Sequence, residues 1–464
     1  MTKIKDFFQL FLEALRGEEQ DYTKINLKRA IFLLSVPMIL EMIMESLFAV
    51  VDIFFVGKLG QSATATVGLT EAVLMIVYSI GVGLSMAATA LVARRFGEKN
   101  YDEAGKSAFQ LIAFGGAISL LISLFGFIFA DNILQLMGAS EKVLEIGVPY
   151  TRIIFAGNMA IMLLFLINGA FRGAGQAHHA MRALWISNGI NIVLDPLLIF
   201  GIGNFSGFGL EGAAWATTIG RSIGVIYQLY HLFNGRHLLA VTRKHIELKW
   251  SIIRNIIVIS AGGIGQFLID SAAWIVLIRL ASQFGDNAVA GLTITFRILM
   301  FTLMPAWGLS GAASTLVGQS LGAGKMKRAG LAVYLTARLN VIFLFFVTFI
   351  YLIFAPQIAS WFINDPDVIE TTATGLRVIV LGYVFFGVGM VMIQAFNGAG
   401  DTKTPMLINI LVFILIEIPL AYLLSTLLEM NMMGIFITIA FCHSLHAMVA
   451  LWFFRKGNWK KVKV

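Results

Sequence analysis

The chain has 464 residues, of which 58% are hydrophobic and 13% are charged, against about 25% charged residues in a soluble protein. With a mean hydropathy of +0.84 and one cysteine, it has neither the polar shell of a soluble globule nor the pattern of a disulfide-stapled domain. The net charge of +8 is expected to lie in cytoplasmic loops of a membrane protein, and no nucleic-acid motif accompanies it.

The first segment, residues 1–28, predicts a short helix at the membrane surface. It carries several acids and no small-residue cleavage site, so it does not resemble a cleavable signal peptide. Phe8, Phe11, Leu12 and Leu15 recur at helical spacing, which is typical of an amphipathic helix lying on a bilayer.

Twelve long apolar stretches follow, each near the roughly 20 residues that a helix needs to cross a bilayer. The predicted fold class is therefore an all-α polytopic membrane protein with twelve transmembrane helices. The predicted spans are 30–56, 64–92, 107–129, 147–169, 183–202, 208–233, 252–281, 288–318, 330–354, 376–398, 405–428 and 432–454.

An internal repeat divides these helices into two sets of six. Residues 81–105 and 306–330 are identical at ten of 25 positions, at an offset of 225. The same offset pairs the loop FRGAGQ at 171–176 with FNGAGD at 396–401. Because six is even, both halves insert in the same orientation, and a pseudo-twofold axis along the membrane normal should relate an N-lobe to a C-lobe.

Lysine and arginine gather in every second loop, beginning with the N-terminal segment. This asymmetry predicts that both termini are cytoplasmic. The predicted organisation is an amphipathic N-terminus at 1–28, an N-lobe at 29–233, a linker at 234–251, a C-lobe at 252–455 and a basic tail at 456–464.

Motifs for catalysis are missing from the sequence. There is no G-x-S-x-G, no H-E-x-x-H and no Walker motif, so we expect neither an enzyme nor an organic cofactor. His443 and His446 lie three residues apart in the last helix, and we interpret them as polar packing between helices. His178 and His179 are expected to be solvated in a cytoplasmic loop.

Carboxylates within apolar helices carry the functional signal. Asp52 lies in the first predicted helix and Asp195 in the fifth, where an acid costs about 2.5–3.5 kcal/mol at the bilayer centre. Removal from water favours the protonated form of an acid, which suits proton exchange near neutral pH. The alternative is a hydrogen-bonded or ion-paired acid that holds helices together. We read Asp52 and Asp195 as functional.

Polar neighbours strengthen this first-lobe site. Asn188 and Asn191 precede Asp195 by two turns and one turn on the same face of their helix. Asn168 and Tyr150 lie on the fourth helix. Because hard cations prefer oxygen ligands, Na⁺ at Asp52, Asp195 and Asn191 remains an alternative to a proton.

Other candidates are weaker. Glu45 in the first half and Asp270 in the second half are equivalent at the offset of 225. They form a second candidate pair. Glu41 and Glu417 are expected to be structural. Pro37 removes one backbone hydrogen bond from the first helix, so it predicts either a static kink or a hinge.

The combination resembles the multidrug and toxic compound extrusion (MATE) family over roughly residues 28–455. The resemblance lies in the repeat of six helices, the run Asp52-Ile-Phe-Phe-Val-Gly57 and the paired loops FRGAGQ and FNGAGDTKTP. It implies V-shaped lobes and export of organic cationic or amphipathic compounds in exchange for H⁺ or Na⁺. It also implies that Asp52, Asp195, Asn191, Tyr150 and Asn168 couple ions and bind substrate, with Pro37 as the hinge. We add Asn188 to this site because it shares the helix face of Asp195.

One departure from the family's pattern bears on which lobe binds the coupling ion. A branch of the family places acids in the seventh and tenth helices, and Asp270 is similar to the first of these. The tenth predicted helix has no acid, which favours coupling in the N-lobe.

The expected protein is a monomeric antiporter of a prokaryotic cell membrane, acting on small organic molecules. The alternative is a lipid-linked oligosaccharide flippase of the same superfamily. Arg279, Arg297 and Arg338 support this alternative, because arginines bind pyrophosphate.

Overall fold

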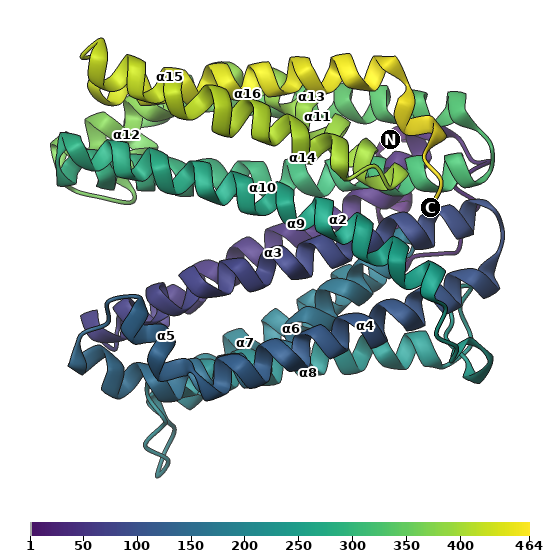
Figure 1. The fold of residues 1–464 in the computed structure, drawn as a ribbon, viewed down its shortest axis with the longest axis horizontal. Helices are drawn as coiled ribbons and strands as arrows, with labels where there is room; N and C mark the ends of the chain where they lie inside the picture. The colour runs from purple at the N-terminus through teal and green to yellow at the C-terminus, as the bar shows by residue number, and fades with distance from the viewer. Residues whose placement is uncertain (1) are drawn as a thin grey trace.

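The computed structural model describes residues 2–464, and long helices account for most of this part of the chain (Figure 1). Ten helical segments are long and apolar enough to cross a membrane. Together with α2 and α8 they make twelve, so the predicted fold class is confirmed. The N-lobe consists of α2 (Leu27–Gly57), α3 (Gln61–Gly97), α4 (Tyr101–Ile128), α6 (Glu141–Gly173), α7 (Ala177–Phe200) and α8 (Leu210–Phe233), with a short α5 (Ala130–Leu136) before α6.

The C-lobe repeats this order with two interrupted helices. Its first three helices are α9 (Trp250–Ala281), α10 (Asp286–Gly322) and α11 (Met326–Ser360). The fourth is divided into α12 (Pro366–Ile379) and α13 (Tyr383–Ala399), and the last is α16 (Asn431–Lys456). The fifth contains α14 (Lys403–Asn409) and α15 (Ile418–Tyr422), which alternate with π-helical stretches at Ile410–Glu417 and Leu423–Leu427.

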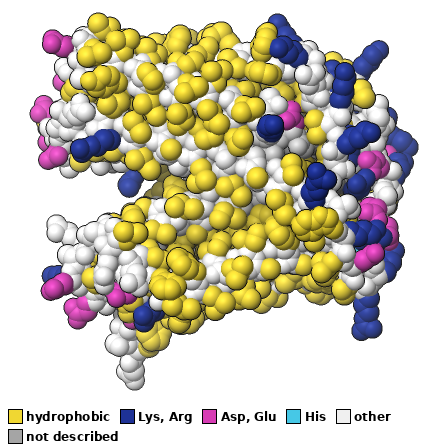
Figure 2. All heavy atoms as spheres, in the orientation of Figure 1, with side chains coloured by type: hydrophobic (Ala, Val, Ile, Leu, Met, Phe, Trp, Pro, Cys, Tyr) yellow, Lys and Arg dark blue, Asp and Glu magenta, His cyan; other side chains and the backbone are white. Residues whose placement is uncertain are grey.

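The two lobes form a V (Figure 1). They meet at the end that carries both chain termini and are spread apart at the opposite end, where Figure 2 shows a deep cleft between them. Lysine and arginine side chains gather at the closed end. This end, formed by the turns 98–100, 174–176 and 323–325 and by both termini, is called the basic face below.

Glycines hold the lobes together at two symmetric crossings. A Cβ on Gly83 of α3 would lie 2.7 Å from the carbonyl oxygen of Ser260 on α9. At the equivalent position of the repeat, a Cβ on Gly308 of α10 would lie 2.6 Å from the carbonyl oxygen of Met38 on α2. Only glycine permits two helix backbones to approach this closely. The repeated glycines therefore mark the contacts at which each lobe packs against the other.

The terminal segments pack on the basic face. The predicted N-terminal helix is present as α1 (Thr2–Arg16), and Glu13 of α1 forms an ion pair with Arg29 of α2 at 2.6 Å. The linker lies along the N-lobe, with Leu239 fully buried. The tail folds back, because Trp459 is fully buried and stacks on Phe454 with ring centroids 4.8 Å apart.

Candidate functional site

Three acids lie along one face of α2. Glu41, Glu45 and Asp52 are spaced by four and seven residues, which places them within about 40° of one another around the helix axis. This helix packs against α7 of the same lobe and α10 of the other. The three side chains therefore share one side of the helix but have different partners along its length.

The acid nearest the basic face is neutralised by an arginine. Glu41 is fully buried, and its Oε1 lies 2.6 Å from Nη2 of Arg172 on α6. Asn168, one turn before Arg172, donates a second hydrogen bond to the same oxygen at 3.2 Å. The structure thus places Asn168 beside Glu41 and not, as the prediction required, in a network with Asp52.

The second acid is also paired. Oε1 of Glu45 lies 2.8 Å from Nη2 of Arg221 on α8, and its Oε2 accepts a hydrogen bond from Asn188 at 2.9 Å. The Arg221 guanidinium also lies over the ring of Phe48, 4.9 Å from its centroid. Asn188 therefore belongs to the Glu45 pair, although it shares a helix with Asp195.

The two remaining acids, Asp52 and Asp195, have no ion-pair partner among the residues that the structure describes. Each lies five residues before the end of its helix, about 7.5 Å from that end and in the half of the lobe that lines the open part of the V. The two carboxylates are within Coulombic range of each other. They are the two acids of α2 and α7 that no arginine neutralises among the described residues.

Asp195 is the more enclosed of the two. It is fully buried, its Oδ1 accepts one long hydrogen bond of 3.4 Å from Asn191, and its Oδ2 has no partner. Asn191 also donates to Thr217 at 3.1 Å and leaves its own Oδ1 unpartnered. Carboxylate and amide oxygens without donors suit a bound proton or a hard cation such as Na⁺.

Two further residues, one aromatic and one acidic, complete this region. Tyr150, a predicted member of the site, is buried in the N-lobe core on α6. Glu71 on α3 is not among the predicted residues, although it is also an acid in an apolar helix. Its side chain is exposed and its charge interacts with Asp52 and with Arg297 of the other lobe. Glu71 is therefore a further acid near Asp52 that the prediction missed.

The C-lobe has a related network that is joined through a neutral amide. Asp270 is the repeat counterpart of Glu45, and His446 is the counterpart of Arg221. Asn409 joins them, because its Nδ2 donates to Asp270 at 2.9 Å while its Oδ1 lies 2.9 Å from Nε2 of His446. His446 thus makes the polar contact between helices that was predicted for it. Glu417, at the end of the first π-helical stretch, is buried.

Pro37 lies inside α2 at the crossing with Gly308. The helix continues through the proline from Leu27 to Gly57, and Trp185 donates a hydrogen bond to the carbonyl of Leu40 at 3.1 Å. The proline removes the hydrogen bond to the carbonyl of Leu33, four residues earlier, whereas the Trp185 bond lies three residues later. Its role as a hinge stays a prediction.

The expectation that His178 and His179 are solvated is wrong. Their exposed fractions are 6% and 2%, because both lie in the first turn of α7 beneath the N-terminal segment. A Cβ on Gly17 would collide with the His178 ring, and the positive φ of +74° at Gly17 is the left-handed conformation that glycine adopts readily. The basic face is therefore a packed layer at this point.

Comparison with known proteins gives one consistent result. A family model described as MatE matches residues 37–197 and 264–423, once in each lobe. A Bacillus subtilis (strain 168) protein named "Probable multidrug resistance protein YoeA" is 25% identical over 451 residues, covering 96% of this chain and 97% of that protein. The Thermotoga maritima protein named "Probable multidrug resistance protein NorM" is 26% identical over 459 residues, covering 98% and 97%.

Solved structures agree in fold over nearly all of the chain. One described as "Outward-facing conformation of a multidrug resistance MATE family transporter of the MOP superfamily" is 26% identical. It covers 95% of this chain and 98% of its own, with a TM-score of 0.89. The agreement extends over both lobes, which is why it includes the V-shaped arrangement as well as the separate bundles.

Proposed function

The chain belongs to the MatE family of transporters, and on that premise we propose that it is a cation-coupled antiporter that exports organic cationic or amphipathic compounds by alternating access. Its bacterial relatives with names of multidrug resistance proteins support the substrate class. The coupling site is the pair Asp52 and Asp195 in the N-lobe, and the coupling ion is H⁺ or Na⁺.

One observation carries this assignment. The N-lobe contains four acids on α2 and α7, and arginines neutralise Glu41 and Glu45 but not Asp52 or Asp195. A buried carboxylate without a cation partner is stable only when it binds a proton or a metal ion. Asp195, fully buried with one oxygen unpartnered, therefore exchanges its stabilising ion during the cycle.

The direction of transport follows from the orientation. Basic residues are retained on the cytoplasmic side of membrane proteins, which assigns the basic face and both termini to the cytoplasm. The cleft then opens outward (Figure 2). In this state Asp52, which is partly exposed, receives the driving ion from the external medium, whereas Asp195 is fully buried. A prokaryotic cell membrane and a monomer complete the proposal.

The cycle follows from competition between ligands. Binding of the ion to Asp52 and Asp195 removes negative charge from the N-lobe and weakens its hold on a cationic substrate, which leaves through the open cleft. The loaded lobe then rearranges so that the ion is released to the cytoplasm and new substrate binds. Such exchange requires that ion and substrate either compete or favour different conformations.

The test is ethidium efflux from proteoliposomes under an imposed pH gradient or Na⁺ gradient, applied separately. Efflux under one gradient that Asp195→Asn abolishes would support the proposal and identify the ion. Efflux that continues unchanged in both Asp52→Asn and Asp195→Asn would overturn the N-lobe assignment.

A lipid-linked oligosaccharide flippase is the second candidate, because exposed arginines occur in the C-lobe. Arg279, Arg297 and Arg338 are exposed. Guanidinium groups of this kind bind pyrophosphate. Translocation of a fluorescent lipid pyrophosphate without any ethidium efflux would favour this function.

A further inference from the structure

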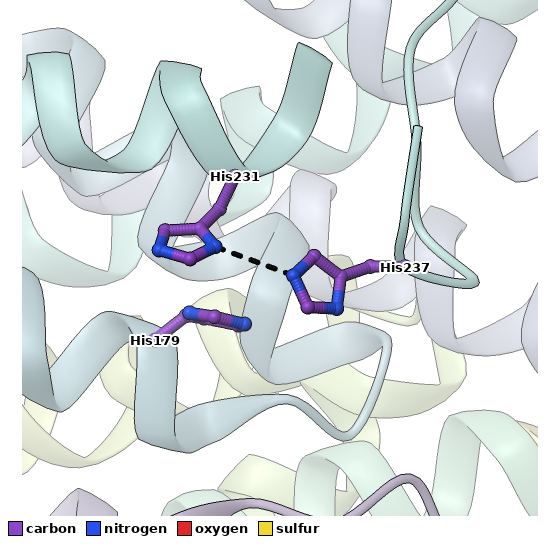
Figure 3. Close-up of side chains that lie close together, drawn as sticks. All are labelled: His179, His231 and His237. Carbon is purple, nitrogen blue, oxygen red and sulfur yellow. Dashed lines mark hydrogen bonds between the residues drawn. The ribbon is translucent and has the colours of Figure 1, made fainter. Parts of the chain in front are cut away.

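Three histidines from three separate segments converge on the basic face, away from the site described above. His179 lies in the first turn of α7, His231 in the last turn of α8, and His237 in the linker between the lobes. One ring nitrogen from each lies within 4.8 Å of the other two. Figure 3 shows the three rings facing a common point, with His237 reaching in from the extended linker.

His179 is the innermost member. It is 2% exposed, and its Nε2 has no hydrogen-bond partner among the described residues. Leaving a buried polar atom without a partner costs about 1–3 kcal/mol, and a ligand bound to this nitrogen would recover that cost. The other ring nitrogen, Nδ1, is 3.1 Å from the hydroxyl of Tyr227.

The remaining two rings already have the spacing of metal ligands. Nδ1 of His231 and Nε2 of His237 are 3.2 Å apart, and the dashed line in Figure 3 marks this hydrogen bond. Two nitrogens at the Zn–N distance of about 2.0–2.1 Å in a tetrahedral site are separated by about 3.3 Å. The spacing of the two nitrogens therefore already matches a shared metal ion, which would bind once the proton between them moves to the other nitrogen of the donating ring.

Outer partners of the rings fit the same purpose. Histidines that bind metals usually have their second ring nitrogen hydrogen-bonded to an oxygen, which fixes the tautomer. The Tyr227 hydroxyl serves His179 in this way, whereas the carboxylate oxygen of Glu19, 3.9 Å from Nδ1 of His237, is too far for a hydrogen bond and acts through its charge. Glu19 is itself held in place, because its Oε1 accepts hydrogen bonds from Gln176 at 3.1 Å and from the backbone N–H of Leu238 at 3.0 Å.

The nearby positive charge is already engaged. Arg182, whose charge interacts with His179, donates to the backbone carbonyls of Leu15 at 2.8 Å and Arg16 at 3.1 Å. These carbonyls hold the guanidinium toward the end of α1. Glu19 places a negative charge beside His237, which favours a cation there.

From this geometry we propose that His179, His231 and His237 form a binding site for a divalent transition-metal ion of the zinc class. Imidazole nitrogens suit Zn²⁺, Ni²⁺ and Cu²⁺ rather than Mg²⁺ or Ca²⁺, which prefer oxygen. Three protein ligands leave a fourth tetrahedral position to water. Because His237 belongs to the linker, the bound ion fastens the connection between the lobes to α7 and α8 and so controls how freely the linker moves.

The experiment measures metal binding to the purified full-length protein. The protein is purified with an affinity tag that contains no histidines, and a chelator removes any bound metal before the titration. Zn²⁺ is titrated by calorimetry, and Co²⁺ is used as a spectroscopic probe whose visible bands report tetrahedral nitrogen ligands. We expect one equivalent per chain and a higher thermal unfolding midpoint with Zn²⁺. His237→Ala should weaken binding at least about tenfold, since even outer-shell changes cost 10–100-fold.

The control is His443→Gln, which removes a partly buried histidine of the C-lobe without touching the cluster. It should bind Zn²⁺ as the wild type does. His179→Gln provides a second ligand variant, and its folding is checked by the same thermal unfolding measurement without metal. Folded wild-type protein that shows no saturable Zn²⁺ binding would overturn the proposal, as would unchanged affinity in both His179→Gln and His237→Ala.

Discussion

Gly97 and Gly322 meet where α3 crosses α10, so the two helices that the repeat makes equivalent touch at equivalent residues. A Cβ on Gly322 would lie 3.0 Å from the Cα of Gly97, and a Cβ on Gly97 would collide with the carbonyl of Gln319. The pseudo-twofold axis passes through this contact. Hydrogen bonds from Thr315 to the carbonyl of Arg172 and from Gln319 to the carbonyl of Gly173, both 2.9 Å, close the V beside it.

Adding one methyl group at this crossing should weaken the closed end of the V. Gly97→Ala is expected to lower the free energy of unfolding by about 1–3 kcal/mol, the usual cost of overpacking a close contact. Thermal unfolding in detergent measures the change. Gly116→Ala is the matched control, because a Cβ there has open space around it and the helix gains stability from alanine. Equal stability of the two variants would contradict the crossing.

Removing the acid from the enclosed site should uncouple transport. Asp195→Asn keeps the shape of the side chain but can no longer exchange a proton, so ion-driven ethidium efflux should fall to the level of empty liposomes. Glu141→Gln, which changes an exposed acid in the first turn of α6, is the control and should leave the efflux rate unchanged. Wild-type efflux in Asp195→Asn would count against its role.

The paired acid nearest the basic face should matter for stability instead. Arg172→Leu leaves fully buried Glu41 without its cation, and we expect a loss of about 3 kcal/mol in unfolding free energy, the low end for a broken buried pair. Arg29→Leu breaks the more exposed Glu13–Arg29 pair and should cost no more than about 1 kcal/mol. SDS-induced unfolding measures the loss of stability in both variants. Equal losses would show that the burial of Glu41 does not determine the free-energy cost of breaking its ion pair.

The C-lobe acid should be dispensable for coupling. Asp270→Asn retains an oxygen that accepts the hydrogen bond from Asn409, so the link to His446 is kept while the charge is lost. We expect efflux under the driving gradient to persist near the wild-type rate. Loss of efflux in Asp270→Asn together with normal efflux in Asp52→Asn would move the coupling site to the C-lobe.

Much of the fold could be predicted from the sequence because membrane insertion depends on local properties. Apolar length locates a spanning helix without reference to its neighbours, and the twelve predicted spans all fall within observed helical segments or overlap their ends. The repeat at an offset of 225 is a feature of the sequence itself. It places α3 at 61–97 and α10 at 286–322, with the same offset at both ends.

The partners of the polar residues were decided only by the tertiary structure. Glu41 and Glu45 are neutralised, unlike Asp52, because each meets an arginine. Arg172 lies 131 positions along the chain from Glu41, and Arg221 lies 176 positions from Glu45. The same holds for Asn168 and Asn188, predicted for the Asp52 and Asp195 network and found at the two paired glutamates, and for the three histidines that converge on the basic face.

The physical reason is that these pairings depend on how helices cross. The hydropathy of a segment determines whether it enters the bilayer but not which of its faces meets which neighbour. That choice depends on close backbone contacts at a few small residues, such as Gly97 against Gly322. The sequence by itself therefore determined the helices, their duplication and the acids within them, while the crossings decided which of those acids remain without a cation.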